Sequence, residues 1–185
     1  TSWLSPAIFD QLPEVSGLLS YWLGAAAILL TSNWIPPDFA ARLPFLAMLA
    51  ITLLATWHGI YYLARSPSAL PVVFAFGGEA KPKDYARTVA DGGLLAFIAS
   101  LGLAQFSHET TPAMAQLCFT SITFYALAAM SYHSISSLAL FFIGTLGLSL
   151  SGAPSLTLIF GIGGLFITYF DDRYSNKRAT THTLR

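Results

Sequence analysis

Three ionisable side chains lie in or beside apolar runs, where an ionisable group is costly: His58, Asp91 and His133. Asp91 is the one carboxylate inside such a run, and a charge at the centre of a membrane costs about 2.5 to 3.5 kcal/mol on insertion scales. Asp91 must therefore lie near a helix end, be paired or be protonated. Arg87, four residues earlier, is spaced to pair with it on one helix face. Since histidine and carboxylate groups carry protons, these residues are candidates for a proton or solute path.

A polar stripe is predicted on a later helix by Gln116, Thr120 and Thr123, at positions i, i+4 and i+7. In a membrane such a stripe either hydrogen-bonds neighbouring helices or lines a path for solute. If it lines a path, the stripe and the Asp91/His58 region are opposite ends of one route. The leading functional expectation is therefore transport or conduction of a small solute or of protons.

Two other classes of function remain open. His58 and His133 could be axial ligands of a haem or a pigment in an accessory subunit of a larger membrane complex, although no specific motif supports either cofactor. Alternatively, His58, Asp91 and His133 could act as metal ligands or acid/base groups of an intramembrane enzyme open to the cytoplasm. They lack the tight local spacing of known metal motifs, and Cys118 is the single cysteine, so no cysteine cluster exists.

The composition is that of an integral membrane protein. Hydrophobic residues make up 55% and charged residues 10% of the 185 residues, whereas about 25% charged residues is usual for soluble domains. The net charge of zero gives no reason to expect a nucleic-acid partner. All lysines lie outside the apolar runs, which excludes a retinal-type Schiff base within a helix.

The apolar runs predict an all-α fold, a polytopic transmembrane helical bundle with about six spanning helices in one domain, residues 15–170. A spanning helix needs about 20 apolar residues. The six candidates are Val15–Ile35, Leu43–Ala64, Thr88–Phe106, Ala113–Tyr132, Ile135–Gly152 and Ser155–Phe170. Only a short polar stretch separates the fourth from the fifth, so five passes stay open.

The segments outside these runs have their own predicted places. Residues 1–14 form a short amphipathic segment that we expect at the membrane interface, and its lack of a basic start argues against a signal peptide. The connection 65–87 is expected to be cytoplasmic or interfacial. Within it, residues 69–78 are too short to span and either lie in the interface or re-enter the membrane. Residues 171–185 form a basic cytoplasmic tail.

The Lys and Arg residues predict an orientation. With six passes, eight of the nine fall on one side, in the 65–87 connection and the tail, and only Arg42 falls on the other. Cytoplasmic loops carry the excess of basic residues. We therefore expect a multi-pass protein, of a bacterial inner membrane, with both termini in the cytoplasm.

Small residues predict where the helices touch. In lipid the hydrophobic effect contributes little to helix association, so helices associate where small residues let their backbones approach closely. Three runs carry them at spacings of three or four residues: Gly17, Ser20, Gly24, Ala27 and Thr31; Gly144, Gly147 and Ser151; Thr157, Gly161, Gly164 and Thr168. Beyond the lipid bilayer, we expect a homo-oligomer or partners in a membrane complex, since faces such as Phe141-Phe142 can pack on another protein.

Overall fold

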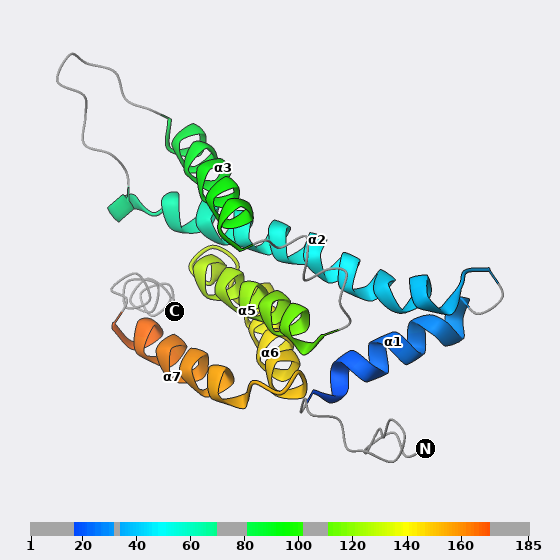
Figure 1. Ribbon diagram of the computed structural model, residues 1–185. Coiled ribbons are helices and arrows are strands. Elements are labelled where there is room, and N and C mark those ends of the chain that lie inside the picture. Colours follow the sequence, from blue (N-terminus) through cyan, green and yellow to red (C-terminus); the bar gives the residue numbers. More distant parts are fainter. Residues whose placement is uncertain (1–16, 32–33, 70–80, 102–110, 171–185) are drawn as a thin grey trace.

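The computed structural model describes residues 17–31, 34–69, 81–101 and 111–170. This part of the chain is all-α, as expected (Figure 1). Its six helices and one 3₁₀ turn are α1 (Leu18–Thr31), α2 (Pro37–Ala64), η1 (Pro67–Ala69), α3 (Pro82–Leu101), α5 (Pro112–Ala129), α6 (Ser134–Leu150) and α7 (Pro154–Phe170). The expected interfacial segment 1–14, nearly all of 69–78 and the tail 171–185 lie outside the described residues.

Proline marks the start of four helices. Pro37, Pro82, Pro112 and Pro154 are the first residues of α2, α3, α5 and α7. Proline suits this position because its φ is already helical and its missing N–H would have no intrahelical acceptor. α3 consequently begins six residues before the expected Thr88, with Asp84 in its first turn, where the helix dipole favours an anion. Residues 82–87 therefore belong to a helix and not to the connection.

The fourth and fifth predicted helices are separate. α5 ends at Ala129, and α6 starts at Ser134 after a turn, in which the Tyr132 and His133 N–H groups both donate to the Ala129 carbonyl. α6 ends at a second turn, in which Gly152 has a φ of 86°. Glycine takes this left-handed conformation without the steric cost that a Cβ would bring. The chain can thus reverse directly from α6 into α7.

α2 is the longest helix and the centre of the packing. It runs the length of the bundle and contacts α1, α3 and α5, while α6 packs on α5 and α7 on α6 (Figure 1). A buried apolar cluster joins α2 to α5 and consists of Phe45, Met48, Met114, Ala115 and Cys118. α3 is held almost entirely by α2, so much of its surface stays exposed.

Glycines mark the closest helix contacts, as the small-residue pattern predicts for α6. A Cβ on Gly144 would meet the Thr123 hydroxyl of α5, and one on Gly147 would meet the Phe119 ring. On α2, a Cβ on Gly59 would approach the Phe124 ring to 2.5 Å. In the other two runs the prediction holds for Gly17 and Gly164, whose Cβ atoms would lie 3.0 Å from the Ser151 carbonyl oxygen and 3.1 Å from the Leu127 side chain, but not for Gly24 and Gly161, which have no neighbour within 4 Å.

Two of the described helices, α2 and α5, are long and apolar enough to cross a membrane. α1, α6 and α7 are apolar but shorter. α3 has 20 residues, of which Lys83, Asp84, Arg87 and Asp91 are charged, and it belongs to neither group. Length and composition therefore identify two candidate membrane spans.

Candidate functional site

Two rows of aromatic side chains on α2 organise the candidate site. Trp57 and Tyr61 are one helical turn apart and form the first row, and their rings stack with centroids 5.4 Å apart and planes at 5°. His58 and Tyr62 form the second row, again one turn apart. Side chains at i and i+4 share a helix face, so α2 directs the first row toward α3 and the second toward α5. The aromatic residues of α2 thereby connect it to α3 and α5.

The second row meets aromatic rings at the end of α5. The His58 ring lies 5.8 Å from Tyr125, and the Tyr62 ring lies 6.0 Å from Tyr125 and 5.0 Å from Tyr132. Beyond the end of α5, His133 meets the Tyr62 ring edge-on, with centroids 5.9 Å apart. We call these rings together with Trp57 and Tyr61 the aromatic cluster. Rings at such distances stabilise one another by about 0.5–1.5 kcal/mol per pair.

Asp91 receives a hydrogen bond from the first row. The Trp57 indole Nε1–H donates to Asp91 Oδ1 across a distance of 2.7 Å, joining α2 to α3. Because α3 begins at Pro82, Asp91 lies in the third turn of its helix, farther from the helix start than the expected start at Thr88 implies. The side chain is exposed. A carboxylate thus lies midway along a helix with an aromatic N–H as its partner.

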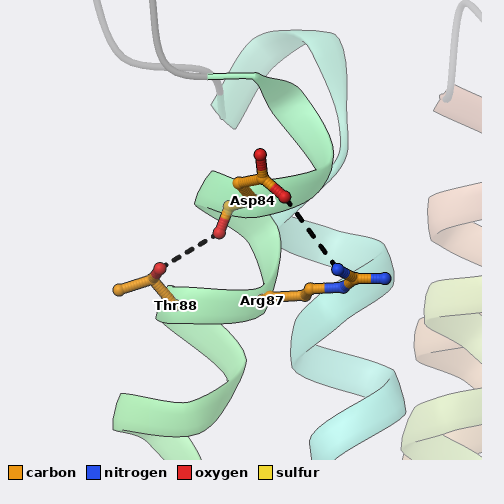
Figure 2. Close-up of polar contacts among 3 residues, drawn as sticks. All are labelled: Asp84, Arg87 and Thr88. Atoms are coloured by element: carbon orange, nitrogen blue, oxygen red, sulfur yellow. Dashed lines mark hydrogen bonds and ion pairs between the residues drawn. The ribbon is translucent and has the colours of Figure 1, made fainter.

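The expected pairing of Arg87 with Asp91 does not form. Within the described ranges the single ion pair joins Arg87 Nη1 to Asp84 Oδ1 at 3.9 Å, one turn toward the helix start (Figure 2). The Thr88 hydroxyl also donates to the Asp84 backbone carbonyl. Residues three or four positions apart are neighbours on a helix, so both Asp84 and Asp91 lie within reach of Arg87. Arg87 pairs with Asp84. Asp91 consequently has no Lys or Arg partner among the described residues.

His58 has a defined tautomer. Its Nδ1 lies 2.8 Å from the Leu54 carbonyl oxygen, and because a carbonyl can only accept, Nδ1 must carry the proton. In the neutral ring the Nε2 lone pair is then the basic site. The neighbouring Trp57 ring stands edge-on to His58 at 4.9 Å. Trp57 therefore contacts both the histidine and, through its indole N–H, the carboxylate.

The three ionisable residues do not assemble into a metal site. No group of three or more His, Cys, Asp or Glu side chains in the described ranges is placed to hold a metal ion. Each of the three residues has a different partner in the aromatic cluster: Trp57 donates to Asp91, Tyr125 contacts His58 and Tyr62 contacts His133. The two histidines are linked through the Tyr125 and Tyr62 rings, and axial ligation of a haem or pigment by them stays a prediction.

Two side chains of the polar stripe on α5 make hydrogen bonds inside the bundle. Gln116 Nε2 donates to the Ser151 carbonyl at the end of α6 across 2.8 Å. Thr123 is buried and donates to the Phe119 carbonyl of its own helix at 2.7 Å. Thr120, between them along α5, is half-buried. Gln116 thus bonds to the neighbouring helix and Thr123 to its own helix, and the role of the stripe as packing or as the lining of a solute path stays a prediction.

The Gln116 bond yields a stability prediction. Replacing Gln116 with leucine should lower the free energy of unfolding by about 1 kcal/mol, because the Ser151 carbonyl loses its interhelical donor. Unfolding in mixed micelles titrated with a denaturing detergent measures this change. If Gln116 instead lined a solute path, the leucine variant would lose flux while its stability stayed that of the wild type.

Sequence reasoning missed two features of this site. It did not identify Trp57 as the partner of Asp91, and it did not connect Tyr125 or Tyr132 to the histidines. The available signal was the repeat of a ring pair after four residues in TWHGIYY, since this spacing places rings on two adjacent faces of one helix. The chain matches no protein-family model, no curated protein and no solved structure, so its function has to be inferred from these residues.

Proposed function

We propose that this chain is a multi-pass membrane protein whose helices cross the bilayer about six times, with both termini in the cytoplasm. α2 and α5 support this by length and composition. The charge distribution along the chain supports the orientation. The 17 residues of α6 and of α7 correspond to about 25 Å at 1.5 Å per residue, slightly less than a hydrocarbon core of about 30 Å, and mild thinning accommodates the difference.

The outer faces of the last two helices suit a lipid environment. Large apolar side chains on α6 are exposed, among them Ile135, Phe142 and Leu146, and α7 exposes Leu158, Ile159 and Ile162. Exposed apolar surface of this extent on a water-soluble monomer would mark an interaction site. If this surface faces lipid acyl chains instead of water, its exposure carries no hydrophobic free-energy cost.

The proposed activity is conduction or transport of protons or a small solute, and Asp91 is the observation that carries it. This carboxylate lies in the middle of α3, is exposed, and accepts a hydrogen bond from Trp57 without a cationic partner in the described part of the chain. An ionisable residue at membrane depth is expensive to keep and typically marks an ion or proton pathway.

His58 supplies a second proton-carrying group near Asp91. It lies seven residues before Arg65, which follows the end of α2, and this spacing corresponds to about 10 Å along the helix. In the proposed orientation, His58 and Asp91 are thus in the cytoplasmic half of the membrane, on either side of Trp57. The Nε2 lone pair of His58 is free to accept a proton, and Asp91 can donate or receive one.

The activity is tested by reconstituting the purified chain into liposomes. A pH-sensitive dye inside the vesicles reports proton entry after a potassium diffusion potential is imposed, and light scattering reports the entry of glycerol. We expect flux of at least one probe above that of protein-free liposomes prepared identically. Vesicles that contain the folded chain and remain as tight as protein-free ones to both probes would contradict the proposal.

A second candidate, a subunit of a larger membrane complex, is favoured by the exposure of α3. This helix packs almost entirely on α2 and exposes Thr88, Asp91, Leu95 and Ile98. A partner helix, or another copy of the chain, could cover that side. Mass measurement of the protein extracted in mild detergent separates the candidates, because a monomer that retains flux needs no partner.

A further inference from the structure

Arg87 lies between two carboxylates of its own helix. Asp84 comes three residues before it and Asp91 four residues after it, so each is within reach on the helix surface. The two acids lie about 10 Å apart along the helix axis. Because aspartate is short, turning the guanidinium toward one carboxylate takes it away from the other. In the structure it is turned toward Asp84, 3.9 Å from Oδ1 (Figure 2).

Interactions within α3 do not explain this choice. Pairs at i,i+3 and i,i+4 differ by less than about twofold in an equilibrium. Both side chains of the observed pair are 63% exposed, and exposed ion pairs contribute little to stability. Their separation of 3.9 Å is also longer than the about 2.7–2.9 Å of a charge-assisted hydrogen bond. The pair with Asp84 is therefore too weak to keep Arg87 away from Asp91.

The contact that distinguishes the two acids comes from α2. The Trp57 indole donates to Asp91 Oδ1 across 2.7 Å, a distance within the charge-assisted range. Trp57 is itself held in place, because its ring stacks on Tyr61 and meets His58 edge-on. A hydrogen bond to a charged group changes an equilibrium about tenfold or more. This exceeds the local difference between the two possible pairs of Arg87.

The packing of α3 keeps Asp91 within reach of Trp57. Ala86 and Ala90 are fully buried, and a Cβ on Gly93 would collide with the Ile60 side chain of α2. Small residues of this kind let two helices approach closely. The bond between the indole and the carboxylate thus forms at a close helix contact.

The partner of Asp91 affects its ability to exchange a proton. A guanidinium carries a full positive charge and favours the ionised carboxylate, whereas the indole donor is neutral. A carboxylate in a proton path must gain and lose its proton in turn. Pairing with Arg87 would hold Asp91 in its charged form and oppose proton uptake.

We propose that Trp57 is a positioning residue, which binds Asp91 to α2 and thereby keeps this carboxylate from pairing with Arg87. The consequence for flux rests on the proton conduction proposed above. The choice of partner is a property of the packed helices and is measured without any flux.

Chemical crosslinking of the full chain in detergent identifies the partner at position 87. Arg87→Lys keeps the charge and supplies an amine, which a carbodiimide joins to a carboxylate in contact as an amide, with loss of water. Peptide mass spectrometry should locate this amide at Asp84. Adding Trp57→Phe should raise the ratio of Asp91 to Asp84 amide about tenfold, whereas adding Tyr61→Phe, which keeps the stacked ring, should not. An unchanged ratio in the Trp57→Phe chain overturns the proposal.

A second variant leaves Trp57 in place and so does not depend on the folding of Trp57→Phe. When Asp84→Asn is combined with Arg87→Lys, the amine loses its observed partner, but Trp57 still binds Asp91. The amide at Asp84 should disappear without an equal amide at Asp91. If Asp91 forms as much amide as Asp84 did, Trp57 does not decide the pairing, and the proposal is overturned.

Proton flux in liposomes tests the consequence for conduction. If Trp57→Phe lowers flux by releasing Asp91 to Arg87, adding Arg87→Gln should recover most of the loss. Adding Lys83→Gln is the matched control, because it removes a positive charge eight residues before Asp91, too far along the helix to pair with it. Equal recovery in the two double variants overturns the role of Trp57 in conduction. If wild type itself conducts no protons, the proposed conduction has failed, and the crosslinks still decide the partner of Asp91.

Discussion

Alanine at Gly144 is expected to destabilise the protein by about 2 kcal/mol, the usual cost of forcing extra volume into a packed contact. The new Cβ would collide with the Thr123 hydroxyl and would come within 3.2 Å of the Phe119 carbonyl oxygen and the Thr123 backbone nitrogen. Thr123 cannot move aside freely, because its hydroxyl is held by the 2.7 Å bond to Phe119. Relief therefore requires α5 and α6 to separate.

Gly161 is the matched control for this substitution. It lies inside α7, and a Cβ there has no neighbour within 4 Å. Alanine is a better helix former than glycine by about 1 kcal/mol, so Gly161→Ala should leave stability unchanged or raise it. Both variants are compared with wild type by unfolding in mixed micelles. Equal stability of the two variants would show that α5 and α6 do not approach as closely as the structure has them.

The second large effect is expected at Asp91, where asparagine should reduce proton flux to the level of protein-free liposomes. Asparagine keeps the size of the side chain and an oxygen that can accept the Trp57 hydrogen bond, so the fold should persist. It removes the group that can exchange a proton. Pyranine fluorescence in proteoliposomes measures the effect, with folding verified by circular dichroism and by elution volume in detergent.

Asp84→Asn is the control for the charge itself. Asp84 lies on the same helix, is exposed, and pairs with Arg87, so its loss should change flux little. Trp57→Phe should lie between wild type and Asp91→Asn, because phenylalanine keeps a ring but cannot donate to the carboxylate. Unchanged flux in Asp91→Asn would remove this residue from the path and favour the subunit candidate.

The aromatic cluster explains why the two histidines were difficult to assign from sequence. Depth along the helices placed His58 and His133 on the same side of the membrane, and the structure does connect them, but through Tyr125 and Tyr62. Spacing along the chain gives depth, because rise per residue is constant. It does not give the rotation of each helix about its own axis. That rotation decides whether two side chains on neighbouring helices touch or are separated by others.

Local chemistry in the sequence was sufficient for the helices. Apolar length predicted six of them, and the proline at the start of α2, α3, α5 and α7 shows how strongly one residue can define a boundary. The early start of α3 was missed because Lys83, Asp84 and Arg87 were interpreted as a hydrophilic connection. On a helix, the first-turn dipole favours Asp84, Asp84 pairs with Arg87, and Lys83 is exposed to solvent.

The sequence by itself determined the all-α fold, the order of the helices and the glycines that bring α6 against α5, because each depends on composition or on spacing within one helix. Only the tertiary structure decided the partners of Arg87, Asp91 and Gln116. An i,i+3 and an i,i+4 pair differ by a few tenths of a kcal/mol, so local preference cannot choose between Asp84 and Asp91. The choice coincides with a cross-helix contact, the Trp57 indole at 2.7 Å from the carboxylate, which exists only once α2 and α3 are packed.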